Sequence, residues 1–356
     1  MSPCAIASRI LSAMMLGVDA RANGSRKRLL LFIVDYPTTP MALLSLDDTS
    51  TRSTLTPGRL IEEMRRAFID LRDGRFELPQ RVALADSGYL VMPTRHRTAD
   101  SLVVKTLSLA ADRDPMISGL VSWSTRDHDR SVVAPAETIT ALRTGAITGL
   151  VTDLVADPAA STLAIFGAGA LAADQVRFTH AVRSLTAVRF VARTPSRAEP
   201  LVAQLQTELP DTSFMITTPT DRHLADIDLV CCATTSTAPL FSATELAETV
   251  HVTAVGSYKS TMHEFGADLI AAASAVLVDD LAACMIESGE LIDAVDAEVI
   301  TRDDITELVS IIDRPQRRGG GDGRSSSPSG SRSRTGRPCI SWPEPSSAEA
   351  AHTSVC

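Results

Sequence analysis

From residue 161 onward, short apolar runs alternate with amphipathic segments. Runs of strand length lie at residues 163–166, 188–192, 214–217, 228–234, 251–256 and 275–279. Apolar residues at helical spacing follow the first two runs, over residues 170–182 and 195–209. This alternation predicts an α/β fold with a parallel, doubly wound sheet, because parallel neighbouring strands need helical crossovers that cover both faces.

Residues 56–155 show a different pattern. An amphipathic helix is predicted from Thr56 to Phe68, because apolar residues recur there at helical spacing, and Gly74 ends it. A second helix is predicted over residues 136–155. Strands separated by turns are predicted between the two helices, at residues 81–84, 88–92, 101–108 and 119–123. This part of the chain therefore reads as a separate α+β unit.

The turn after the first apolar run carries a glycine pattern. Gly167, Gly169 and Ala172 are spaced as G-x-G-x-x-A between a strand-like run and a helix-like segment. Gly167 permits the turn, Gly169 lets a pyrophosphate approach the backbone, and Ala172 allows close packing of helix on strand. The helix start offers free N–H groups to phosphates. A glycine turn of purely structural use is the alternative. The pattern predicts a dinucleotide site formed by Gly167, Ala168, Gly169, Ala170 and Leu171.

The end of the second predicted strand bears on which dinucleotide binds. NAD sites usually place Asp or Glu there to hold the ribose hydroxyls. This chain has no acid at that point and instead carries Arg193, Thr194, Ser196 and Arg197. These guanidinium and hydroxyl groups suit the extra phosphate of NADP(H). We therefore predict NADP(H) as the preferred cofactor, with NAD(H) as the second candidate; the alternative is that these residues only cap the next helix.

Composition and charge narrow the class of protein. With 356 residues, 44% of them hydrophobic, the chain is long enough for two domains with sizeable cores. Its net charge of −9 argues against a nucleic-acid partner. No apolar run approaches the roughly 20 residues that span a bilayer, so no membrane partner is expected. The six cysteines are scattered, and His223, His251 and His263 lack metal-ligand spacing, so we expect no metal, reduced thiols and a cytoplasmic protein.

The two ends of the chain differ from its middle. Residues 1–40 lack the order of a signal peptide, and we expect a dispensable, disordered extension, with Met41 as an alternative start. After Arg314 the chain turns into Ser, Arg, Gly and Pro, so residues 315–356 are predicted to be disordered. A helix read out of frame from a GC-rich gene would have this composition. We hypothesise a frameshift near residues 307–325, with a genuine disordered tail as the alternative.

Several motifs together resemble the ornithine cyclodeaminase/μ-crystallin family. In chain order they are Met92-Pro93, the Val-Val-Lys105 strand, Leu142-Arg-Thr-Gly-Ala146, the Gly-Ala-Gly turn with Gln175, Val255-Gly-Ser-Tyr-Lys259, Glu264, Asp279-Asp280 and Glu287-Ser-Gly-Glu-Leu291. The resemblance runs from about residue 43 to residue 305. It implies a homodimer with a Rossmann domain over residues 158–284. It also implies a substrate and dimerisation domain over residues 41–157, to which helices from residues 285–314 return.

The resemblance also assigns residues to the substrate. Lys105 lies in an otherwise apolar strand, where a buried lysine is costly unless it is paired; an edge strand with Lys105 in solvent is the alternative. Similarity to the family places Lys105 near the carboxylate and the reacting carbon of the substrate. It places Arg81 and Arg143 where arginines clamp that carboxylate bidentately. The alternatives are a surface charge for Arg143 and an ordinary arginine before a strand for Arg81.

One departure from the family discriminates between activities. Family cyclodeaminases have an aspartate after the fifth strand, whereas this chain has Ser257 and Tyr258 there, and a hydroxyl is a poor general base at neutral pH. The resemblance therefore favours an NAD(P)-dependent oxidoreductase acting on a small amino acid or a cyclic imino acid such as pyrroline-2-carboxylate. Ornithine cyclodeaminase with NAD(H) and a ligand-binding protein without turnover are the alternatives. Thr234 and Ser257 are expected to contact the cofactor, because their loops follow strands at the carboxyl edge of the sheet; for the loop of Thr234, hydroxyls that face solvent are the alternative.

Overall fold

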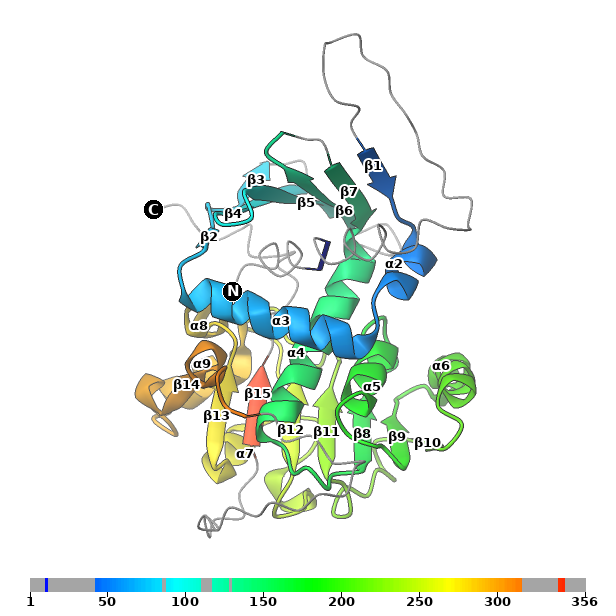
Figure 1. The fold of residues 1–356 in the computed structure, drawn as a ribbon. Coiled ribbons are helices and arrows are strands. Elements are labelled where there is room, and N and C mark those ends of the chain that lie inside the picture. The colour runs from blue at the N-terminus through cyan, green and yellow to red at the C-terminus, as the bar shows by residue number, and fades with distance from the viewer. Residues whose placement is uncertain are drawn as a thin grey trace. The chain divides into compact units, whose positions relative to one another are not determined.

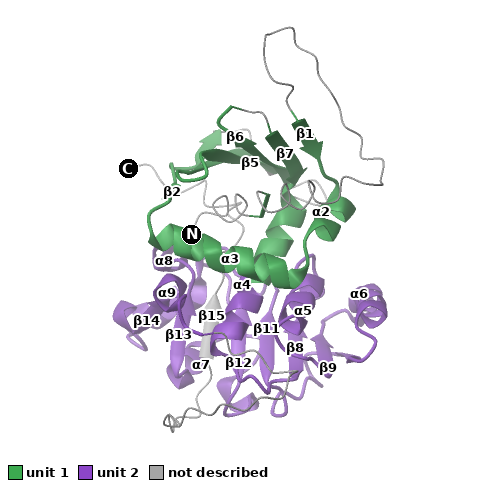
Figure 2. Ribbon diagram, in the orientation of Figure 1, with its two compact units in different colours: residues 1–146, 346–356 green, residues 147–345 purple. Residues whose placement is uncertain are grey.

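The computed structural model describes residues 10–11, 42–84, 88–109, 117–127, 130–315 and 339–342 (Figure 1). The chain forms two compact units, of which unit 1 comprises residues 1–146 and 346–356, and unit 2 comprises residues 147–345 (Figure 2). The division lies inside a continuous helix, whereas the sequence placed the domain boundary after residue 157.

Unit 1 is a mixed sheet with helices. Its elements are β1 (Ala42–Ser45), α2 (Asp48–Thr54), α3 (Pro57–Arg72), β2 (Phe76–Glu77), β3 (Val82–Leu84), β4 (Tyr89–His96), β5 (Ser101–Leu109), β6 (Ile117–Thr125), β7 (Arg130–Pro135) and the first half of α4 (Ala136–Val155). The sheet has the order β1-β7-β6-β5-β4-β2, and β3 also pairs with β4. The pairs from β2 to β7 are antiparallel, and β1 lies parallel to β7.

Local sequence explains where α3 begins and ends. Thr56 caps its first turn by accepting a hydrogen bond from the Arg59 N–H, and Pro57 takes the first helical position, where its missing N–H costs nothing. The buried side of the helix includes Leu60, Met64 and Phe68. The chain leaves the helix through Gly74 at a φ of 66°, which suits a residue without a Cβ.

The two faces of the unit 1 sheet carry different side chains. Register places Met92, Lys105 and Val121 side by side on three neighbouring strands, and all three are buried. Alternation along the strands turns their neighbours to the other face, where Leu102 and Leu120 are 41% and 52% exposed. One face is therefore the core of the unit and the other is an exposed apolar surface.

Unit 2 is an eight-stranded parallel sheet with the order β10-β9-β8-β11-β12-β15-β13-β14 (Figure 1). Its strands are β8 (Thr162–Phe166), β9 (Ala187–Val191), β10 (Ser213–Thr217), β11 (Leu229–Cys232), β12 (His251–Ala254), β13 (Ala275–Val278), β14 (Ile305–Glu307) and β15 (Cys339–Trp342). The order 3-2-1-4-5 of its first five strands reverses between β8 and β11. This reversal makes the carboxyl end of β8 the place where a doubly wound sheet binds its ligand.

Helices cover both faces of this sheet. They are α5 (Ala172–His180), α6 (Pro195–Glu208), α7 (Ala267–Ala272), α8 (Leu281–Glu287), α9 (Gly289–Asp296), α10 (Leu308–Ile311) and the short 3-10 turns η1 (Ala243–Glu245) and η2 (Arg302–Asp304). Leu163 and Ile165 of β8 pack in one core with α5 and α6, and Ala164 and Phe166 pack in the other with α7 and α9. The strand is thus buried on both faces, as its unbroken apolar run predicted.

Residues 285–314 belong to unit 2 in this division, whereas the resemblance assigned them to the substrate domain. The physical reason is that Leu291, Ala294 and Ile305 are buried in the same core as Val230 and Val252 of the sheet. No helix in the described ranges is long and apolar enough to cross a bilayer.

Residues 339–342 differ from the prediction of a disordered tail. They form β15, which pairs in parallel with β12 on one side and with β13 on the other. The segment Cys-Ile-Ser-Trp follows a stretch, residues 316–337, that has no large apolar residue, and its Ile and Trp favour strands. The proposed frameshift region beyond residue 315, the remaining tail and most of residues 1–40 lie outside the described residues.

Candidate functional site

The glycine turn has the geometry that a dinucleotide requires. Gly167 follows β8 with a φ of 101°, and a Cβ on it would lie 2.4 Å from the carbonyl oxygen of Ala233. A side chain is therefore excluded there by both backbone conformation and space. A Cβ on Gly169 would meet nothing within 4 Å, so the backbone there faces open space. Ala172 is fully buried against the sheet at the start of α5. The residues present fit a bound dinucleotide.

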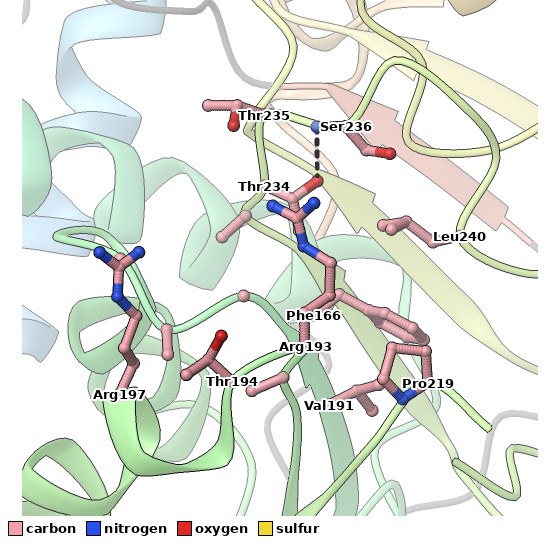
Figure 3. Close-up of a pocket in the computed structure, with 15 residues that line it drawn as sticks. Phe166, Val191, Arg193, Thr194, Arg197, Pro219, Thr234, Thr235, Ser236 and Leu240 are labelled. Atoms are coloured by element: carbon pink, nitrogen blue, oxygen red, sulfur yellow. Dashed lines mark hydrogen bonds between the residues drawn. The ribbon is translucent and has the colours of Figure 1, made fainter. Parts of the chain in front are cut away.

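A cavity of about 280 Å³ opens at this turn, at the carboxyl ends of β8, β9 and β11 (Figure 3). It is lined by Phe166, Gly167, Ala168, Gly169, Val191, Ala192, Arg193, Thr194, Arg197, Pro219, Ala233, Thr234, Thr235, Ser236 and Leu240. The cavity therefore brings together most of the residues that the sequence assigned to the cofactor. Ala170, Leu171 and Ser257 are not part of its lining.

The wall formed by the end of β9 and the start of α6 is basic. Figure 3 shows Arg193 at the end of the strand and Arg197 extending from the first turn of the helix. Both side chains are exposed, and neither forms an ion pair with any residue that the structure describes. Thr194 is the N-cap of α6, but its side chain makes no capping hydrogen bond. The Thr194 hydroxyl therefore does not cap α6, which was the alternative to phosphate binding. With two exposed arginines, this wall can accept an anion.

The opposite wall is the loop after β11. The Thr234 hydroxyl donates to the Glu264 carboxylate at 2.7 Å and accepts a hydrogen bond from the Ser236 N–H at 3.2 Å. The Thr234 N–H also donates to Glu264, at 2.7 Å. The Thr234 hydroxyl therefore already donates its only proton to Glu264 and has none left for a ligand. Thr234 shapes the cavity through its backbone and methyl group.

Glu264 is fully buried behind this loop. Burial raises the pKa of its carboxyl to about 7, although the hydrogen bonds from Thr234 and Gly256 act in the opposite direction. The charge of Glu290 adds to the rise in pKa. A Cβ on Gly256 would lie 2.0 Å from the Thr234 carbonyl oxygen, so the two loops are in direct contact.

Ser257 is hydrogen-bonded to a second buried carboxylate, that of Glu290. Its hydroxyl donates to Glu290 Oε1 at 2.7 Å, and the Ser288 hydroxyl donates to Glu290 Oε2 at 3.0 Å. Ser257 is 6% exposed. Its side chain thus supports the loop after β12 from within, and its predicted contact with the cofactor stays a prediction.

Unit 1 places the candidate substrate residues on its core side. Lys105 is 3% exposed, and its Nζ donates to the Thr140 hydroxyl of α4 at 3.2 Å. Arg143 lies almost one turn further along the same helix and is 1% exposed. The solvent-exposed alternatives for both residues are excluded by this burial. Arg81 directly precedes β3, and strand alternation gives it the face opposite to Val82, which is the face of Lys105.

Sequence reasoning did not include Glu264 and Glu290 among the site residues. Both were visible as parts of the family motifs, but a glutamate in a loop is ordinarily a solvated charge. Their burial depends on a loop and the start of α9, 26 residues apart in the chain, as the hydrogen bond from the Glu264 N–H to Glu290 Oε1 shows. Among the described residues, no group of three or more His, Cys, Asp or Glu side chains is arranged to hold a metal ion.

Comparison with known proteins agrees with this architecture. Delta(1)-pyrroline-2-carboxylate reductase of Bacillus cereus is 27% identical over 255 residues, which are 70% of this chain and 72% of that protein. The structure of Thermococcus litoralis Delta(1)-pyrroline-2-carboxylate reductase in complex with NADH and L-proline has a TM-score of 0.70 at 20% identity, covering 84% of this chain and 91% of that one. A probable ornithine cyclodeaminase from Bordetella pertussis has a TM-score of 0.69 at 22% identity, covering 86% and 92%.

At these identities the two structures show the fold. The family assignment comes from the family model, which matches residues 42–326 and so spans both units. With the doubly wound sheet and the glycine turn in place, this match means that the chain belongs to the ornithine cyclodeaminase/mu-crystallin family.

Proposed function

We propose that this protein is an NAD(P)H-dependent reductase of a small cyclic imino acid, such as Δ1-pyrroline-2-carboxylate. The observation that carries the proposal is the cavity at the glycine turn, where Gly169 leaves open space and Arg193 and Arg197 supply positive charge. The relatives named as pyrroline-2-carboxylate reductases support the substrate class. The cofactor, when bound, supplies the hydride that adds to the imine carbon.

The residues of unit 1 supply the rest of the reaction. Arg143 and Arg81 carry permanent positive charges and hold the substrate carboxylate. Lys105 hydrogen-bonds the imine nitrogen and delivers the proton that the nitrogen needs as hydride reaches the neighbouring carbon, so that C=N becomes CH–NH. Because Lys105 already donates to Thr140 at 3.2 Å, its position is set before substrate binds.

The loop after β12 favours imine reduction over cyclodeamination. The family's cyclodeaminases carry an aspartate in this region, and this chain has Ser257, whose hydroxyl is held by Glu290 at 2.7 Å. A hydroxyl donating to a buried carboxylate does not act as a base toward an amino group. The second candidate, a binding protein without turnover, shares every feature of the cavity and is separated from the reductase only by an assay.

NADP(H) is the cofactor that the basic wall favours. Arg193, Thr194 and Arg197 line the cavity where a dinucleotide-binding fold holds the adenosine ribose, and no acid lies among the lining residues. A 2′-phosphate would find two guanidinium groups and a hydroxyl there.

A homodimer in which the exposed faces of two unit 1 sheets pack together would bury the apolar residues of that face. Val82, Leu84, Tyr89, Leu102 and Leu120 are 41–52% exposed and lie on adjacent strands. Apolar side chains gathered on one sheet face mark a protein interface more often than bare surface. The partner that we propose is a second copy of the chain.

We place the protein in the cytoplasm. Three buried cysteines of the described ranges, Cys231, Cys232 and Cys284, are not in disulfides. Burial raises the pKa of the Cys231 and Cys232 thiols, so they are unreactive and suit a reducing compartment.

The experiment that tests the function uses the purified full chain. NADPH and NADH are each mixed with Δ1-pyrroline-2-carboxylate, and loss of absorbance at the wavelength of the reduced nicotinamide is followed with product analysis for proline. We expect turnover that is faster with NADPH. Ammonia release from ornithine without imine reduction would instead identify a cyclodeaminase, and cofactor binding without turnover in any arm would identify a binding protein.

A further inference from the structure

Two buried carboxylates lie behind the cavity without lining it. Glu264 is 0% exposed and Glu290 is 2% exposed. Glu264 lies in the loop between β12 and α7, and Glu290 lies in the first turn of α9. Neither carboxylate touches substrate or cofactor in the proposed reaction, although a buried carboxylate is expensive to keep.

Glu264 joins the loops that follow β11 and β12. One of its oxygens accepts from the Thr234 N–H and the Thr234 hydroxyl, and the other accepts from the Gly256 N–H at 2.9 Å. The same Thr234 hydroxyl accepts from the Ser236 N–H, a contact drawn in Figure 3. Both Thr234 and Ser236 line the cavity. The carboxylate therefore fixes a cavity wall from behind.

Glu290 in turn fixes Glu264. It accepts from the Glu264 N–H at 2.6 Å and from the Ser257 hydroxyl at 2.7 Å. The result is a continuous series of hydrogen bonds that runs from α9 through Glu264 to Thr234 and Ser236. A change at Glu264 would loosen the wall without removing any atom that lines the cavity.

Energetics argue that this arrangement serves something other than stability. Among the residues that the structure describes, the charge that shifts the pKa of Glu264 is that of Glu290, and Glu264 in turn acts on the buried thiols of Cys231 and Cys232; no ion pair with a cation is seen there. Burial of an unpaired negative charge destabilises a fold, and an apolar residue of similar size is often cheaper. A single carboxylate that accepts from three donors holds those donors in fixed positions. Fixed positions are what the wall of a binding cavity requires.

We propose that Glu264 is a positioning residue for the dinucleotide, acting through Thr234 on the cavity wall. The inference rests on the proposed binding of NAD(P)(H) in that cavity. The carboxylate, with its two oxygens both accepting, sets the orientation of Thr234 and of the Ser236 N–H. An amide at residue 264 would present an NH2 group to one of the same donors and would turn the loop away.

The chain contains a matched control. Asp228 also accepts from two backbone N–H groups and one threonine hydroxyl, those of Ser161 and Thr162. It lies at the amino ends of β8 and β11, the edge of the sheet opposite to the cavity. A variant of Asp228 therefore shows the effect of losing such a carboxylate on stability alone, and an effect on the cavity is seen only in the variant of Glu264.

The test measures dissociation constants of NADPH and NADH by nucleotide fluorescence on the full chain. Variants are Glu264→Gln, Asp228→Asn, Thr234→Val and the double variant Thr234→Val with Glu264→Gln. We expect Glu264→Gln to weaken binding about tenfold, Asp228→Asn to leave it unchanged, and the double variant to bind no more weakly than Glu264→Gln alone. Wild-type affinity should also fall as pH falls through about 7, the pKa of Glu264, and this step should vanish in Glu264→Gln.

Two results would overturn the proposal. The first is Glu264→Gln binding as tightly as wild type, and the second is additive losses in the double variant. If wild type binds neither nucleotide, the proposed function fails and not the positioning role alone. Should Glu264→Gln fail to fold by circular dichroism, Thr234→Val decides: it must weaken binding while Asp228→Asn does not.

Discussion

The Lys105 ammonium donates to the Thr140 hydroxyl at 3.2 Å, so the strand that carries the lysine is tied to the helix that carries Arg143. The Thr140 hydroxyl itself donates to the Ala136 carbonyl at 2.7 Å, which leaves its oxygen free to accept from the lysine. This geometry gives Lys105 a fixed position on the core side of the sheet, where an amine can serve a substrate.

Replacement of that lysine tests its role. Lys105→Met keeps the length and apolar stem of the side chain but removes the proton donor, so we expect turnover to fall by about a hundredfold or more while the dissociation constant of NADPH stays the same. Steady-state kinetics and nucleotide titration measure both. Arg126→Met, which removes an exposed cation of the same unit, is the control. Retained turnover with only a raised KM would show that Lys105 binds substrate and does nothing more.

The proposed preference for NADP(H) rests on Arg193. If Arg193 holds the 2′-phosphate as proposed, Arg193→Ala removes a charge-assisted contact that only the phosphorylated cofactor makes, so we expect the dissociation constant of NADPH to rise about ten- to a hundredfold and that of NADH to stay near wild type. Arg302→Ala, which removes another exposed arginine of unit 2, is the control. An equal loss for both nucleotides would refute the assignment to the 2′-phosphate.

Much of the fold follows from the sequence, and α4 is a clear case. Its predicted bounds, residues 136–155, are those of the structure. The parallel sheet was equally predictable, because buried runs such as Leu163–Phe166 alternate with helices. Family resemblance supplied the candidate substrate residues, and the structure adds that Lys105 and Arg143 are both buried.

The parts that sequence did not reveal depend on distant contacts. Strands β1 and β7 pair across 88 residues, as the register of Ala42 with Arg130 shows, and neither was predicted from the sequence. The role of Glu264 as an acceptor from Thr234 and Gly256 requires two loops to meet at the sheet edge. No local pattern distinguishes such a glutamate from a solvated one.

The exposed apolar face of unit 1 predicts the oligomeric state. Leu120→Lys places a charge in the middle of that face, where burial against a second copy would be unfavourable, so we expect the dimer to dissociate. Light scattering after size-exclusion chromatography measures the mass. Met215→Lys, at a 57% exposed apolar residue of unit 2, should leave the dimer intact. A monomeric wild-type protein, or a Leu120→Lys variant that stays dimeric, would contradict this interface.

The raised pKa of Glu264 also predicts that the stability of the protein depends on pH. Its pKa is raised in the folded protein from 4.5 to about 7, so the folded state binds more protons than the unfolded state between these values. The contribution of Glu264 to stability is therefore fully present below pH 4.5 and is lost as pH rises to 7, by about 3 kcal/mol. Chemical denaturation of wild type and Glu264→Gln from pH 5 to 8 measures it. The difference between the two should change across this range; a constant difference would show that Glu264 does not titrate there.

Single-turnover reduction of Δ1-pyrroline-2-carboxylate by NADPH tests the proposed imine reduction most directly. The enzyme, saturated with NADPH, is mixed with the imino acid, and nicotinamide oxidation and proline formation are followed together for wild type and Lys105→Met. We expect one proline formed for each NADPH oxidised by wild type, and NADPH that stays bound but reduced in the variant. Proline formation at the same rate in both proteins, or none in wild type while NADPH is bound, would contradict it.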